Sequence, residues 1–173
     1  MMKINVAQSD ENIGSADSFA FSTSAEELDV LHETYSIDGP VRVEGKIVNT
    51  GLFYRVDGVV HCKKAFRCDR CLEDFVQEQE HSFAEKYQKK AEDDDAVSEE
   101  DRDVNYFDGE VIDLTDLIRD TILLAQPLNN ICSPACRGLC MKCGANLNES
   151  DCGCDRQVVD PRLAVLQQLL NKK

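Results

Sequence analysis

The sequence predicts an α+β fold, with a largely antiparallel β-sheet, packed helices and a small C-terminal cysteine-rich zinc-binding segment. Three observations lead to this prediction: period-two alternation from residue 41 onward, helical spacing of apolar residues at 114–125 and 160–170, and six cysteines within 132–154. For a chain of 173 residues, we expect an α+β domain at 1–130 and a tail with a closing helix at 131–173.

Alternation of apolar and polar side chains, which is typical of a strand with one buried face, predicts the sheet. The expected strands are 19–21, 41–47, 52–56, 59–66 and 72–87. Asp57-Gly58 separates two of them and is a dipeptide typical of hairpin turns. A short helix is expected at 24–32. Cys68 and Cys71 lie between the last two strands, so this pair is expected to cap a hairpin.

The segment 89–103 is strongly charged and has no apolar periodicity. Like charges repel one another and offer nothing to bury, so we expect a solvated acidic loop, with an acidic partner-binding segment as the alternative. Order is expected to return at 104–112 as a short strand pair around an Asp108-Gly109 turn.

Two amphipathic helices are predicted after this strand pair. The first has Asp113 as its N-cap, and its apolar residues fall on one face until Pro127 ends the pattern. The second has Asp160 as its N-cap and Pro161 at the first helical position, where the missing N–H costs nothing. Both helices are expected to pack on the sheet.

The charge of the chain limits its partners. With 19 basic and 33 acidic side chains, the formal net charge is -14, which repels polyphosphate, so non-specific nucleic-acid coating and a DNA partner are not expected. The longest apolar run, 122–125, is far too short for a membrane span, and the first ten residues lack the apolar stretch of a signal peptide. We therefore expect a cytoplasmic protein without a membrane partner.

The nine cysteines indicate metal or redox chemistry, because clustered thiols in a reducing compartment rarely form disulfides. Cys140 and Cys143 are separated by two residues and precede Gly144, a spacing that lets a tight turn present two thiolates to one zinc ion. The favoured ligands are Cys136, Cys140, Cys143 and Cys154. Cys132 and Cys152 remain candidates, because spacing cannot choose four of six. Four protein ligands leave no open position, so the zinc is expected to be structural.

The hairpin pair Cys68 and Cys71 has three interpretations: a plain structural turn, a contribution to a metal site with tail cysteines, or a redox dithiol. Basic residues also gather around it in an otherwise acidic chain. The expected contact surface, held by the Cys68/Cys71 turn, consists of Lys63, Lys64, Arg67 and Arg70. The alternative is an ordinary solvated strand face.

The common phosphate-binding, dinucleotide-binding, hydrolase and metalloprotease signatures are absent from the sequence. We therefore do not expect an enzyme. The alternative is a thiol-based redox or metal-dependent enzyme that uses Cys68 and Cys71, motivated by the cysteine content alone.

Four motifs occur in a characteristic order: CDRCLE at 68–73, the segment 106–117, the cysteine-rich segment 137–148 and DPRLAVL at 160–166. Together they resemble the YceD family, the large ribosomal RNA subunit accumulation proteins of bacteria and plastids. The resemblance covers about residue 15 to the end of the chain and includes the cysteine-rich tail of one type of member.

The resemblance implies a non-enzymatic factor that supports accumulation of large-subunit ribosomal RNA and ribosome assembly. Its partner would be a precursor of that RNA or a ribosomal protein, and no catalytic residue is carried over. Some branches of the family lack the tail, which implies that the tail is a stabilising device and that the hairpin is the better candidate for a contact surface.

Overall fold

The computed structural model describes residues 2–10, 12–30, 35–90 and 104–155. It divides into two compact units. The sheet unit comprises Met1–Phe66 and Phe75–Leu128, and the cysteine unit comprises Arg67–Asp74 and the residues from Asn129 onward. The loop Arg67–Asp74, here called the hairpin loop, therefore groups with the cysteine-rich tail, which a boundary drawn at residue 130 does not anticipate.

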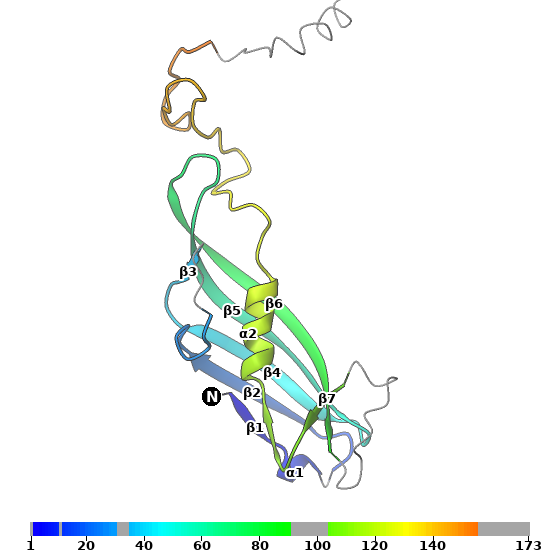
Figure 1. Ribbon diagram of the computed structural model, residues 1–173. Coiled ribbons are helices and arrows are strands. Elements are labelled where there is room, and N and C mark those ends of the chain that lie inside the picture. The colour runs from blue at the N-terminus through cyan, green and yellow to red at the C-terminus, as the bar shows by residue number, and fades with distance from the viewer. Residues whose placement is uncertain (1, 11, 31–34, 91–103, 156–173) are drawn as a thin grey trace, which may run out of the picture. The chain divides into compact units, whose positions relative to one another are not determined.

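The sheet unit contains a six-stranded sheet with the path β2-β4-β5-β6-β7, and β3 pairs with β5 beside this path (Figure 1). Its strands are β2 (Ala16–Thr23), β3 (Tyr35–Ile37), β4 (Val41–Asn49), β5 (Tyr54–Arg67), β6 (Asp74–Lys89) and β7 (Asn105–Phe107). A second, antiparallel sheet joins β1 (Lys3–Asn5) to β8 (Val111–Asp113). With the helices α1 (Ala7–Asp10) and α2 (Thr115–Leu124), this arrangement confirms the predicted α+β class.

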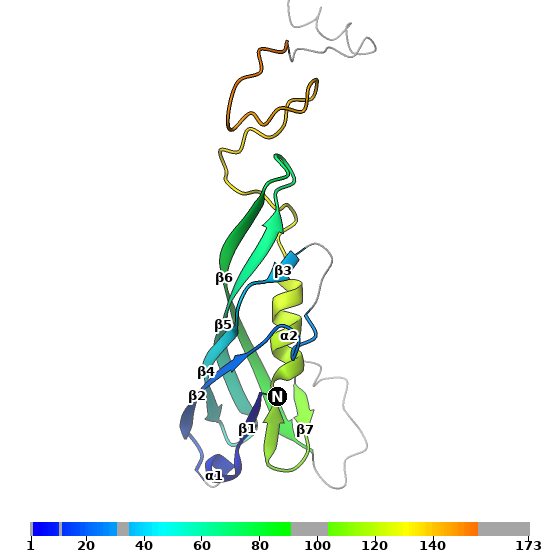
Figure 2. The same cartoon turned by 90° about the vertical axis from the view of Figure 1, so that its left-hand side faces the viewer.

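Helix α2 covers one face of the sheet (Figure 2). Its apolar residues Ile118 and Ile122, with Leu114 just before it, are fully buried in a core shared with the valines of β4 and β5. Burying a side chain of this size stabilises a fold by about 1.5–3 kcal/mol. The prediction of Asp113 as the N-cap of α2 is wrong by one residue, because Leu114 occupies that position. The Asp113 carboxylate lies just before it and accepts hydrogen bonds from the Thr115 backbone N–H (3.0 Å) and hydroxyl (2.5 Å).

The prediction of a turn at Asp57-Gly58 is wrong. Strand β5 runs through this dipeptide without a break, and Gly58 pairs with Gly45 of β4. A Cβ on Gly45 would collide with the Asp57 carbonyl oxygen, and a Cβ on Gly58 would collide with the ring of Phe83. The missing side chains of these glycines therefore leave room for the Asp57 carbonyl and the Phe83 ring inside the sheet. The turn between β4 and β5 lies instead at Gly51, where φ is +89°.

The prediction of a helix at 24–32 is also wrong for the part that the structure describes. Residues 25–29 form turns, and Asp29 has a φ of 52°, a left-handed conformation that a right-handed helix does not accommodate. Ser24 and Thr23 bond locally instead: the Glu27 N–H donates to the Ser24 hydroxyl (3.3 Å), and the Thr23 hydroxyl donates to the Glu27 carboxylate (2.6 Å). Short polar side chains commonly compete with helices in this way.

The segment 104–112 forms two strands, but they do not pair with each other. Strand β7 runs parallel to β6, and β8 pairs with β1, which lies near the N-terminus. The turn between them contains Gly109 with a φ of +75°. The closing helix expected at 160–170 lies outside the described residues, as does the acidic loop apart from residues 89 and 90. In the described part of the chain, we find no helix of the length and apolarity needed to cross a membrane.

Candidate metal centres

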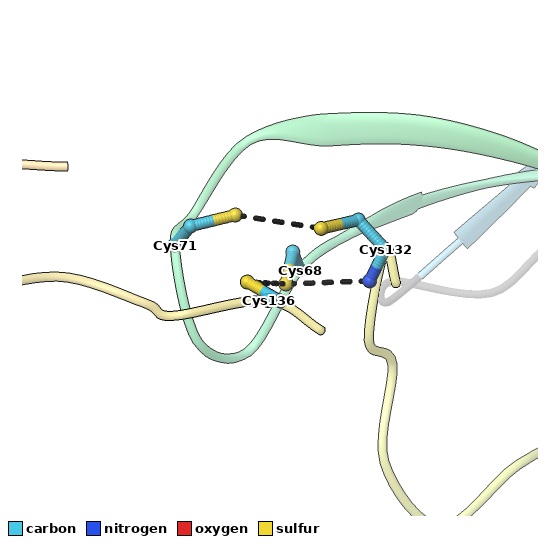
Figure 3. A group of neighbouring side chains, drawn as sticks. All are labelled: Cys68, Cys71, Cys132 and Cys136. Carbon is cyan, nitrogen blue, oxygen red and sulfur yellow. Dashed lines mark hydrogen bonds between the residues drawn. The ribbon is translucent and has the colours of Figure 1, made fainter. Parts of the chain in front are cut away.

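Eight of the nine cysteines gather into two groups of four within the cysteine unit. The hairpin cluster consists of Cys68, Cys71, Cys132 and Cys136 (Figure 3). The tail cluster consists of Cys140, Cys143, Cys152 and Cys154. In each group, all four sulfur atoms lie within 4.8 Å of one another. The ninth, Cys62, is buried in the sheet core, and burial raises the pKa of its thiol.

The favoured ligand set Cys136, Cys140, Cys143 and Cys154 does not form one group. Cys136 belongs to the hairpin cluster, and Cys152 takes the fourth place in the tail cluster. Spacing could not show this, because two of the cysteines that accompany Cys136, Cys68 and Cys71, come from a loop more than 60 residues earlier in the chain. The number of cysteines was one signal available in the sequence, since the hairpin pair and the six cysteines at 132–154 are together sufficient for two four-ligand sites. Of the three interpretations of Cys68 and Cys71, the geometry favours a shared metal site.

The hairpin loop is tight enough to bring its two thiols together. The Cys68 N–H donates to the Glu73 carbonyl (2.9 Å), and the Leu72 N–H donates to the Cys68 carbonyl (2.9 Å). Leu72 adopts a left-handed conformation with a φ of 61°, which reverses the chain. In the resulting turn, Cys71 points toward Cys132, as Figure 3 shows.

Hydrogen bonds hold the tail against this loop. Asp69 and Asn130 are doubly paired: the Asp69 N–H donates to the Asn130 carbonyl (2.8 Å), and the Asn130 N–H donates to the Asp69 carboxylate (2.7 Å). The Arg70 guanidinium donates to the Cys136 carbonyl (3.1 Å), and the Arg70 carbonyl accepts from the Leu139 N–H (3.0 Å). The sequence singled out only Arg70 among these residues, and as part of a basic surface, because the contacts with the tail depend on segments that are distant along the chain.

The sulfur spacing in the hairpin cluster fits a tetrahedral metal site. The Sγ atoms of Cys71 and Cys132 are 3.7 Å apart, and those of Cys68 and Cys136 are 3.9 Å apart. Four thiolates bound tetrahedrally at about 2.3 Å from one zinc ion lie about 3.8 Å from one another. A disulfide would require about 2.05 Å. These two distances therefore match those between ligands of one zinc ion, and the remaining sulfur pairs lie within 4.8 Å.

N–H groups aimed at the sulfur atoms favour thiolates in the hairpin cluster. Burial of Cys68 works to raise its pKa, but N–H donors, first that of Cys132 (3.4 Å), outweigh it and lower the pKa to about 6. The side-chain amide of Asn148 donates to Cys136 (3.4 Å) and lowers the pKa of that thiol. Desolvation of the Cys132 sulfur and the neighbouring thiols raise the pKa of Cys132 to about 12. A cation is the group that would offset this mutual repulsion.

The tail cluster has a more open setting. Cys140 is buried, but Cys143 is exposed and the other two cysteines are half-buried. The Cys140 N–H donates to the Ala145 carbonyl (2.8 Å), and its carbonyl accepts from the Gly144 N–H (2.9 Å), which closes the expected turn. Backbone N–H groups of Cys143 and Lys142 lower the pKa of Cys140 to about 6. Each cluster could hold a metal ion with four protein ligands and no open position.

The structure removes Lys64 from the expected contact surface. Its side chain is fully buried in the sheet unit, where Nζ donates to the Ile122 carbonyl (3.0 Å) in the last turn of α2 and lies 4.8 Å from the centre of the Tyr35 ring. Alternation along β5 explains this placement, because residues 60, 62, 64 and 66 share the buried face. A cation at the C-terminal end of a helix interacts favourably with the helix dipole. Burial lowers the pKa of Lys64.

The other basic residues of that expected surface are engaged to different degrees. Lys63 is exposed and forms an ion pair with Glu78 (2.7 Å). The Arg67 Nε donates to the Leu72 carbonyl (2.9 Å) in the hairpin loop, and Arg70 reaches the tail as described above. Two of the four side chains therefore have structural contacts in the cysteine unit, and one is buried in the sheet unit.

Comparison with known proteins places this architecture in a family. The model of the family described as large ribosomal RNA subunit accumulation protein YceD matches residues 56–170. The chloroplastic large ribosomal RNA subunit accumulation protein YCED homolog 1 of Arabidopsis thaliana is 30% identical over 146 residues, which cover 70% of this chain and 46% of that protein. The chain thus spans about half the length of this relative.

Bacterial relatives match over more of their length. An uncharacterised protein of Mycobacterium bovis is 32% identical over 144 residues, or 83% of this chain and 67% of that protein. The uncharacterised protein YlbN of Bacillus subtilis is 30% identical over 161 residues, or 90% of each chain. No solved structure matches. The family match includes β5, β6, α2 and all eight clustered cysteines, and it confirms the resemblance seen in the motifs: this chain belongs to the YceD family.

Proposed function

We propose that this protein supports accumulation of large-subunit ribosomal RNA as a non-enzymatic factor in ribosome assembly, acting in the cytoplasm. The observation that carries the proposal is the family match over residues 56–170, in a family described by that role. The same description occurs in the name of the Arabidopsis relative, which aligns with 70% of this chain.

A binding role rather than a catalytic one is supported by the chemistry of the two clusters. Four protein ligands around one ion leave no position for a water molecule or a substrate, which a catalytic metal site requires. The alternative thiol enzyme at Cys68 and Cys71 is weakened by burial, because Cys68 is 0% exposed and Cys71 is 3% exposed. A nucleophilic thiol must be reached by its substrate.

The proposal includes a structural zinc ion in the tail cluster. Thiolates are soft ligands that suit zinc, and a set of four is typical of structural zinc sites. The described tail residues bury Leu147 and few other apolar side chains, so the segment lacks a hydrophobic core of its own. A zinc ion would supply the missing stabilisation.

The partner that we favour is a basic ribosomal protein of the large subunit, and the precursor RNA is the alternative. The formal net charge of -14 attracts a basic partner and repels RNA. The expected basic surface is also reduced, since Lys64 is buried and Lys63 is paired with Glu78. Arg67 and Arg70 of the hairpin loop are exposed, and we propose that both contribute to the contact.

Depletion of the protein in its own host tests the function. We expect a selective fall in the ratio of large-subunit to small-subunit ribosomal RNA, with altered precursor ends, that a wild-type copy restores. An unchanged ratio would contradict the proposal. Crosslinking of the protein in gradient fractions then separates the partners, because crosslinks to a ribosomal protein support the favoured partner and crosslinks only to RNA overturn it.

A further inference from the structure

We propose that the hairpin cluster is a second metal site, so that the chain holds two thiophilic divalent cations such as Zn²⁺, and that the hairpin ion is held more tightly than the tail ion. The hairpin ion would link the loop Arg67–Asp74 to the tail from Asn129 onward through two thiolates from each. This inference rests on the tail zinc ion of the proposed function, but it does not depend on the proposed role in ribosomal RNA accumulation.

The first support is the origin of the ligands. Cys68 and Cys71 come from a hairpin loop, and Cys132 and Cys136 come from a tail segment more than 60 residues later. Sulfur distances of 3.7 and 3.9 Å between the two segments match the edge of a tetrahedron around one zinc ion, about 3.8 Å. A site with two ligands from each segment resembles the two-knuckle arrangement of structural zinc sites, in which the ion replaces a core.

The second support is that contacts other than those of an ion already hold the ligands in place. The double pairing of Asp69 with Asn130 and the Arg70 contacts with Cys136 and Leu139 fix the tail on the loop. Gly138 allows this approach, because a Cβ there would lie 2.9 Å from the Arg70 carbonyl oxygen. A site whose ligands are fixed before binding loses less conformational entropy when the ion arrives.

The third support is the set of groups around the sulfur atoms. The Cys132 N–H and the Asn148 side-chain amide donate to Sγ atoms of Cys68 and Cys136 (3.4 Å each). Such outer donors orient ligands and offset the negative charge of a four-thiolate site, and their loss commonly weakens metal binding. Asn148 is itself fixed, since its carboxamide oxygen accepts from the Arg137 N–H (2.7 Å).

The two clusters differ in exposure, and this difference sets the expected order of metal loss. Three of the four hairpin cysteines are buried, whereas Cys140 is the one buried cysteine of the tail cluster. A chelator or a competing thiol reaches an exposed thiolate ligand more readily than a buried one. We therefore expect the tail ion to leave first and the hairpin ion to leave slowly.

Metal content per chain is the first measurement. The full chain is purified without chelator, and zinc is counted by native mass spectrometry and elemental analysis. We expect two ions in the wild type, one in the double variant C68S/C71S, one in C152S/C154S, and two in the matched control C62S, which changes the cysteine outside both clusters. One ion in the wild type, or two in C68S/C71S, would overturn the proposal.

The rate of metal release tests the order in which the two ions leave. With a chromogenic chelator in excess, we expect two phases in the wild type, the loss of the fast phase in C152S/C154S and the loss of the slow phase in C68S/C71S. A slow phase that persists in C68S/C71S would contradict the assignment. A double variant can fail to fold, so N148A provides a milder change. We expect N148A to accelerate only the slow phase of metal release and to retain two metal ions per chain.

Cobalt substitution provides a readout on the unaltered chain. Two tetrahedral four-thiolate sites should give intense visible d–d bands and thiolate charge-transfer bands that saturate at two equivalents of Co²⁺. Saturation at one equivalent, or disulfides found by mass spectrometry under reducing purification, would refute the second site. A failed result here leaves the depletion phenotype unaffected, so the two proposals fail separately.

Discussion

The sheet unit and the cysteine unit are stabilised in different ways. The sheet unit buries a continuous core in which α2 packs on valines of β4 and β5. Among the described residues of the cysteine unit, the buried hydrophobic side chains are those of Cys68, Cys71, Cys136, Cys140 and Leu147. A segment this small cannot exclude enough apolar surface from water to fold by burial, so it depends on hydrogen bonds and on whatever the thiols bind.

Metal removal should give the largest difference in stability between the two units. Structural zinc contributes about 10–16 kcal/mol of apparent binding free energy in small zinc-folded peptides, far more than one core side chain. We expect a strong chelator to make 129–155 sensitive to protease, while the strands of the sheet unit stay protected. Limited proteolysis with mass mapping of the fragments checks this outcome.

Readdition of zinc is the control for that experiment, and it should restore protection of the tail. If the tail is equally resistant with and without chelator, then hydrogen bonds alone stabilise the cysteine unit. If the sheet unit also becomes sensitive, the two units do not unfold independently.

Core truncation in α2 should affect the sheet unit next most strongly. Ile122 is 0% exposed and Leu124 is 86% exposed, although both lie in the last turn of the same helix. We expect Ile122→Ala to lower the free energy of unfolding by about 2–5 kcal/mol through lost burial and a cavity. Leu124→Ala, the matched control, should change it by less than about 0.5 kcal/mol. Urea unfolding followed by circular dichroism measures both, and equal effects would place Ile122 outside the core.

Substitution of two neighbouring lysines should change the free energy of unfolding by less than core truncation does. Lys64→Ala should lower the free energy of unfolding by about 1–3 kcal/mol, because it deletes a buried stem and a donor to the Ile122 carbonyl. Lys63→Ala, on the exposed face of the same strand, should leave the unfolding midpoint unchanged. The same urea titration compares them, and a loss with Lys63→Ala as large as that with Lys64→Ala would show that burial is not the cause.

The pH dependence of Lys64 sharpens this test. Burial lowers the pKa of Lys64 in the folded state, so above that pKa the unfolded state, with its lysine pKa of about 10.4, binds more protons. The stability of the wild type should therefore rise relative to Lys64→Met as the pH rises toward about 10. Parallel unfolding curves for the two proteins between neutral pH and that value would show that Lys64 does not titrate differently on folding.

Local patterns predicted the elements whose signals are local. The alternation of Val41, Val43 and Ile47 predicted β4, and helical spacing predicted α2. The error at Asp57-Gly58 arose because the same dipeptide occurs both in tight turns and in closely paired strands. Which of the two forms here depends on the ring of Phe83, which packs against Gly58. Similarly, a basic cluster in the sequence did not show that Lys64 faces the core.

Residue types and spacings along the chain were sufficient to predict the fold class, the cysteine-rich tail, the hairpin pair and the family. Three features became visible only in the folded chain: Lys64 lies in the core, β8 pairs with β1, and Cys136 lies beside Cys68 rather than Cys140. These three outcomes depend on which distant segments meet. Spacing limits the distance between neighbouring residues along the chain, but only the packed chain brings residues 68 and 136 to the same point in space.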